Sequence, residues 1–81
     1  MPAWSTALRV TGTDAGDVEL YVQTARALNA YAAGRRSVAV TSRVVEDHAM
    51  GRLRESQLVA VLVHELGHHA TGATRPMLLL S

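Results

Sequence analysis

The stretch from Glu55 to Ala70 is the feature that most limits what this chain can fold into. Within it, residues 58–63 read LVAVLV and are all apolar. A helix that is apolar on every face is typical of the interior of a domain, so we expect a central, buried helix over about residues 55–70. Glu55 would favour the positive end of the helix dipole, and Gly72 is placed to end the helix.

The same helix carries the run HELGHH at residues 64–69. His64 and His68 lie about 40° apart around a helix with about 100° per residue, one turn above the other. Glu65 is rotated about 100° from His64 and about 60° from His68. His69 is turned about 100° away from His68, so we interpret it as a packing residue or an outer support of the site. Gly67 either allows close approach of a substrate or a neighbouring element, or is a packing contact.

This arrangement of two histidines and a glutamate is typical of zinc hydrolases with the pattern H-E-x-x-H. The two imidazoles of His64 and His68 can bind one Zn²⁺ ion, and Glu65 is placed to reach a water on that ion. Zinc would polarise the scissile carbonyl and acidify the water, while Glu65 would act as general base. The competing interpretation is a buried helix whose histidines are hydrogen-bonded and hold no metal.

The remaining elements point to an α+β fold. We expect strands at about 6–11, with Leu8 and Val10 on one face, at 18–22 and at 37–41. The segment 18–22 alternates like a half-buried strand, but Val18 and Val22 also begin a helical stripe that continues through residues 25, 28 and 32. We expect a short helix or turn at 44–49 and a loop at 50–52. His48, with Glu46 and Asp47, is more typical of a solvated polar cluster than of a metal site.

Composition narrows the function classes. Eighty-one residues predict a single domain. A net charge of +1 argues against nucleic acid as a partner. Cysteine is absent, which excludes disulfides and thiolate metal sites. No signal peptide or complete transmembrane segment is predicted, and residues 77–80 are either the start of a missing hydrophobic segment or a C-terminal cluster that packs on the domain.

Three stretches together resemble a known family. They are Leu28–Ala32 (LNAYA), Ser37–Thr41 (SVAVT) and Leu58–His68 (LVAVLVHELGH). This combination is similar to the HtpX-like and CAAX-prenyl-protease group of membrane zinc metallopeptidases, which are of the gluzincin type. The resemblance covers about residues 18–72.

The resemblance implies a small antiparallel or mixed sheet packed on a central active-site helix, in a partial zincin-like catalytic domain spanning residues 1–81. It implies that His64 and His68 bind Zn²⁺, that Glu65 is the catalytic base, and that the substrate is a peptide or protein. It favours a strand at 18–22, and it implies that Ser37–Thr41 aligns an extended substrate by backbone pairing. It further implies association with a membrane in a longer form of the protein.

The chain departs from the family pattern at the third zinc ligand, a glutamate on a later helix. Residues 70–81 (ATGATRPMLLLS) contain no carboxylate or imidazole side chain. The resemblance therefore implies a domain truncated after the motif helix. Candidates for the third ligand are Glu46, Asp47, His48 or a second chain, the last of which would involve self-association. Glu55 lies too far back on the helix. We therefore expect a zinc-dependent metalloendopeptidase, or alternatively a non-catalytic metal-binding or interaction module that keeps the fold.

Overall fold

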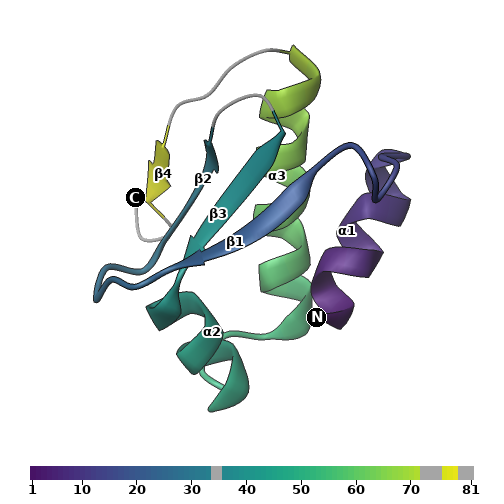
Figure 1. The fold of residues 1–81 in the computed structure, drawn as a ribbon. Helices are drawn as coiled ribbons and strands as arrows, with labels where there is room; N and C mark the ends of the chain where they lie inside the picture. Colours follow the sequence, from purple (N-terminus) through teal and green to yellow (C-terminus); the bar gives the residue numbers. More distant parts are fainter. Residues whose placement is uncertain (34–35, 72–75, 79–81) are drawn as a thin grey trace.

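The fold is described by a computed structural model for residues 1–33, 36–71 and 76–78. The chain alternates between helices and a sheet, which confirms the predicted α+β class (Figure 1). In chain order the elements are α1 (Pro2–Thr11), β1 (Glu19–Gln23), β2 (Asn29–Ala33), β3 (Ser37–Thr41), α2 (Ser42–Ala49), α3 (Glu55–Thr71) and β4 (Pro76–Leu78).

The strands form one mixed sheet in the order β1-β3-β2-β4. β1 runs parallel to β3, whereas β2 is antiparallel to both β3 and β4. The strand predicted at 37–41 is confirmed with the same bounds, and the one predicted at 18–22 is confirmed with a shift of one residue. β3 is almost wholly buried because it lies between two other strands and carries β-branched residues on both faces.

β2 was not among the predicted strands. Its sequence, NAYAA, is rich in alanine, which has a weak preference for strands. Ala30 and Ala32 are buried and alternate with half-buried neighbours. β2 is therefore covered on both faces of the sheet, and this packing favours the strand. The helical stripe that competed with the strand at 18–22 is therefore wrong.

The end of β3 fixes the connection between β1 and β2. The Thr41 hydroxyl donates to the Ala27 carbonyl at 2.5 Å, and the Asn29 N–H donates to the same hydroxyl at 3.3 Å. The Ser42 hydroxyl lies 3.1 Å from both the N–H and the carbonyl of Ala25. These bonds hold the loop across the end of the sheet and set where β2 begins.

The predicted strand at 6–11 is wrong, because these residues belong to the helix α1. Leu8 and Val10 alternate, which suggested a strand, but Ala3, Ala7 and Leu8 form the buried stripe and Val10 is 65% exposed. The spacing of four residues between Ala3 and Ala7 is helical, and this stripe packs against α3.

Both ends of α1 carry signals that outweigh the alternation. Pro2 stands in the first turn, where its missing N–H costs nothing. Gly12 ends the helix with a positive φ of 66°, and the Thr13 N–H donates to the Leu8 carbonyl at 2.9 Å. A residue with a side chain would be strained at that φ, so glycine fixes the end of α1.

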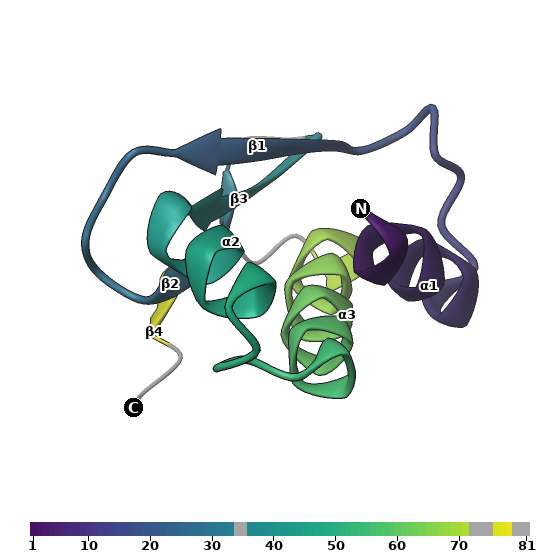
Figure 2. The ribbon, with the colours of Figure 1, turned by 90° about the horizontal axis from the view of Figure 1, so that it is seen from below.

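The three helices lie on the same side of the sheet (Figure 2). α3 packs against β2 and β3 on one side and against α1 on the other. The helix predicted at 55–70 is confirmed as Glu55–Thr71, while Gly72 lies outside the described residues. The predicted short helix at 44–49 is confirmed as α2, and the chain turns at 50–52 with a positive φ of 78° at Gly51.

α3 is not buried on every face, so that part of the prediction is wrong. Its buried stripe is formed by Leu58, Leu62, Glu65 and Leu66. Ala60, His64 and Gly67 lie on an exposed stripe of the same helix. The apolar run therefore marks a helix that is covered on two sides and open along a third.

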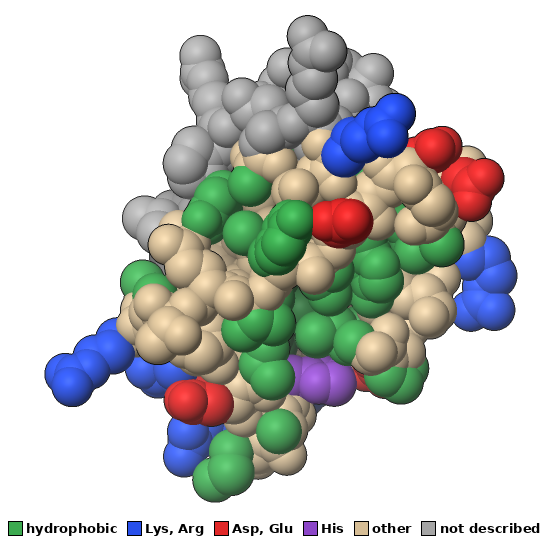
Figure 3. Space-filling model, in the orientation of Figure 1, with side chains coloured by type: hydrophobic (Ala, Val, Ile, Leu, Met, Phe, Trp, Pro, Cys, Tyr) green, Lys and Arg blue, Asp and Glu red, His purple; other side chains and the backbone are tan. Residues whose placement is uncertain are grey.

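Hydrophobic side chains gather across the middle of the face shown in Figure 3. On β1, Tyr21 and Val22 remain exposed, Val22 at 57%, although the alternation predicted a half-buried strand. β1 is an edge strand, and the helices cover it less completely than they cover β3. At the other edge of the sheet, Pro76–Leu78 form the strand β4. Residues 77 and 78 are therefore not the start of a helical hydrophobic segment, which was one of the two predictions for residues 77–80. Residues 79–80 lie outside the described part.

We expect Leu62→Ala to lower the free energy of unfolding by about 2–5 kcal/mol, because it removes a fully buried side chain from the centre of α3. Val10→Ala is the matched control, since its side chain is exposed and its loss should change stability by less than about 0.5 kcal/mol. Urea denaturation followed by circular dichroism measures both. Equal effects of the two substitutions would contradict the packing described.

Candidate metal centre

The last turns of α3 bring together the three residues singled out by the sequence. One ligand atom each from His64, Glu65 and His68 lies within 4.8 Å of the others. In the part of the chain that the structure describes, no other group of histidine and acidic side chains is arranged to hold a metal. The spacing along one helix is sufficient to produce this arrangement, as predicted.

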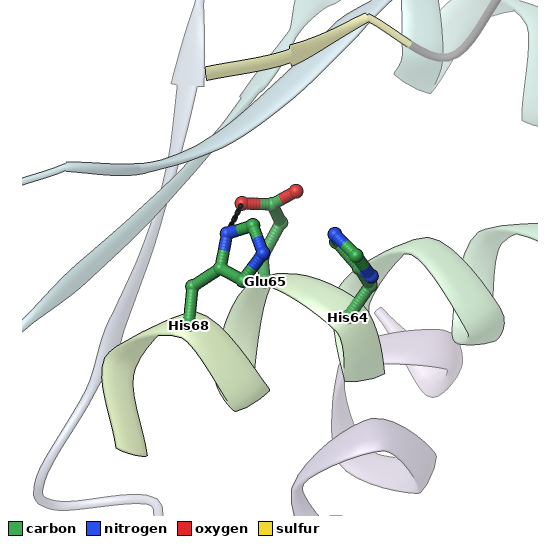
Figure 4. Close-up of side chains that lie close together, drawn as sticks. All are labelled: His64, Glu65 and His68. Carbon is green, nitrogen blue, oxygen red and sulfur yellow. Dashed lines mark ion pairs between the residues drawn. The ribbon is translucent and has the colours of Figure 1, made fainter. Parts of the chain in front are cut away.

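The two imidazoles lie close and at an angle to one another. Their ring centroids are 4.3 Å apart and their planes are inclined by 64°. In Figure 4 the three side chains rise from the same side of α3 and point toward the strands. Such convergence is what two nitrogen ligands of a single ion require.

Glu65 has no exposed surface, unlike the two histidines beside it. Its Oε1 lies 3.5 Å from Nδ1 of His68. A carboxylate beside one ring nitrogen of a histidine sets the orientation of the ring and leaves the opposite nitrogen, here Nε2, facing a metal. The geometry thus suits His68 for binding through Nε2.

The site opens toward the exposed stripe of α3. His64 is exposed and His68 is partly exposed. At Gly67 an added Cβ would meet no atom of the described residues within 4 Å. The side chain of His69 lies outside the described residues.

The candidates for a third ligand on α2 do not join the three residues. Asp47 is buried and pairs with Arg43 at 3.0 Å and with Arg52 at 3.5 Å. His48 lies 3.5 Å from Glu55, which places both away from the metal group. Asp47 thus stabilises the turn between α2 and α3: its carboxylate pairs with Arg52, and its backbone carbonyl accepts from the N–H groups of Arg52 and Leu53.

The prediction that Ser37–Thr41 aligns a substrate is also wrong. β3 is bonded to β1 on one side and to β2 on the other, so neither of its edges can take a further strand. An extended peptide can pair with an edge of the sheet, but not with its centre.

Comparison with known proteins agrees with these observations. The family model described as peptidase family M48 matches residues 5–81, which is nearly the whole chain. Neither the curated proteins nor the solved structures that were searched gave a match.

We expect Zn²⁺ to raise the melting temperature of the chain, because an ion bound only by the folded state stabilises it by about 2.7 kcal/mol at a hundredfold excess over its Kd. His64→Ala and His68→Ala should abolish most of this shift. His48→Ala is the matched control and should keep the shift, since His48 of α2 lies beside Glu55 and away from the three residues. Loss of the shift in His48→Ala but not in His64→Ala would place the metal elsewhere.

Proposed function

This chain belongs to peptidase family M48, and we propose that it is a zinc-dependent endopeptidase in which His64 and His68 bind the metal and Glu65 is the general base. The observation that carries the proposal is the grouping of these three side chains within 4.8 Å on α3.

The donor set fits zinc. Imidazole nitrogen is a common ligand of Zn²⁺, and two such groups converge here beside a carboxylate. When bound, zinc would supply Lewis-acid polarisation of the scissile carbonyl and of a water molecule. The histidines hold the ion, and the exposed side of α3 at His64 and Gly67 admits the substrate.

Glu65 moves the proton in this proposal. It would accept a proton from the attacking water and deliver it to the amine that leaves. Its Oε1 faces His68. Oε2 would therefore be the atom that exchanges protons with water and substrate. Complete burial of the carboxylate keeps bulk water from competing for these protons.

A catalytic zinc ion needs a third protein ligand. We propose that it comes from outside the described residues, either from a further segment or from a second copy of the chain. Membership of the HtpX-like or CAAX-prenyl-protease group, and association of a longer form with a membrane, belong to the same proposal. None of the described helices is long and apolar enough to cross a bilayer.

Glu65→Gln should keep zinc and lower the rate of peptide hydrolysis by about 10²–10⁴-fold, because it removes the base while preserving the shape of the side chain. The measurement is cleavage of a quenched fluorescent peptide, with zinc per chain determined in parallel.

Glu55→Gln supplies the control on the same helix, since Glu55 stands in the first turn beside His48. It should cleave at the parent rate. Cleavage by Glu65→Gln at the parent rate would refute the role of Glu65. A parent chain that binds zinc but cleaves no peptide would instead favour the non-catalytic metal-binding module.

A further inference from the structure

The outer edge of β2 is occupied by the chain itself. β4 pairs with it antiparallel, with Leu78 opposite Asn29, Met77 opposite Ala30 and Pro76 opposite Tyr31. The outer edge of β1 lies at the far side of the sheet, separated from β4 by β3 and β2. β4 therefore covers the edge of the sheet that borders β2.

That edge lies beside the metal centre. α3 packs against β2, and Ala30 and Ala32 of β2 are buried. Methyl side chains let the backbone of a strand approach a helix closely. In Figure 4, β4 crosses on the side of α3 toward which His64, Glu65 and His68 point. A peptide that is to be cut at this centre would extend along the same edge.

β4 is a poor occupant of the edge. Within the described residues its pairing covers Asn29, Ala30 and Tyr31 of β2. Pro76 has no N–H to donate to the ladder. A peptide without proline has an N–H at every position along β2.

A polar atom at the end of β2 also lacks a partner. Oδ1 of Asn29 is buried and accepts no hydrogen bond within the described part of the chain. A buried acceptor without a hydrogen bond destabilises the arrangement that leaves it so. The pairing with β4 leaves this acceptor unsatisfied at the position opposite Leu78, which again marks β4 as a replaceable partner.

We propose that residues 76–78 are an internal competitor for peptide, which holds the β2 edge until an extended substrate displaces it. The proposal rests on the proposed function, because it takes the edge beside the metal centre as the substrate edge. The bound segment lowers the fraction of molecules that can accept peptide, and the apparent Kd rises in inverse proportion to that fraction.

The test compares three versions of the 81-residue chain, all carrying Glu65→Gln so that nothing is cleaved. One also has Pro76, Met77 and Leu78 replaced by glycine, which weakens a strand. The probe is a fluorescein-labelled peptide with the sequence of residues 73–80, ATRPMLLL, and binding is followed by anisotropy. A scrambled peptide checks specificity, and Met50→Gly controls for the loss of an exposed apolar side chain.

We expect the glycine variant to bind the probe about 10-fold more tightly than the Glu65→Gln chain, as for an edge that is open in about a tenth of parent molecules. Met50→Gly should bind like the Glu65→Gln chain. Equal affinity in all three chains, or no binding in any of them, overturns the proposal. Should the triple variant fail to fold, Met77→Gly makes the same comparison with a smaller expected change.

A kinetic readout separates this proposal from the proposed function. In chains that keep Glu65, the glycine substitutions should lower KM and leave kcat unchanged, because a competitor for the free site does not alter the chemical step. Cleavage with an unchanged KM would overturn the competitor while leaving the peptidase intact. Absence of cleavage in every chain would refute the proposed function, and the binding comparison would still decide the role of residues 76–78.

Discussion

The packing of α3 against two partners at once is the interaction on which the rest of the structure depends. Leu58, Leu62 and Leu66 belong to the core, where α1 lies on one side and the sheet on the other. Each buried leucine contributes about 1.5–3 kcal/mol from burial of its side chain. A chain of 81 residues without cysteine has no disulfide to add to this, so its folded state relies on one helix being covered from both sides.

The candidate metal centre uses the same helix, which ties the geometry of the site to the core. Glu65 lies on the buried stripe between Leu62 and Leu66, whereas His64 lies on the exposed stripe. The packing of the two leucines therefore sets the rotation of α3 about its axis. That rotation decides how deeply the carboxylate is buried and how far the imidazoles face outward. A carboxylate held in this way has a fixed orientation in the folded chain.

The sequence predicted the elements in which several signals agree. Ser37–Thr41 combines β-branched residues with alternation, and Glu55–Thr71 combines a long apolar run with a motif at helical spacing, so both were found with nearly their observed bounds. The three residues of the metal centre followed from the second of these alone, since neighbours on one helix need no knowledge of the tertiary fold.

Failures arose where a local pattern competed with packing. At 6–11 the prediction gave more weight to the alternation of Leu8 and Val10 than to the proline and glycine at the two ends of α1. β2 was missed because alanine has a weak preference for strands. Its alanines fit here because α3 packs closely against β2, and that packing is known only from the fold. The interior place of β3 likewise depends on strand order, which joins residues far apart in the chain.

The contact between α1 and α3 has a consequence for the order in which the chain folds. α1 is made before α3 during synthesis, yet the surface that buries Ala3 and Ala7 is formed by residues at least 48 positions later, because α3 begins at Glu55. The hairpin of β2 and β3, by contrast, joins near neighbours and can form early. The first helix on the chain is thus among the last to reach its native environment, and its apolar stripe is exposed to other chains while it waits.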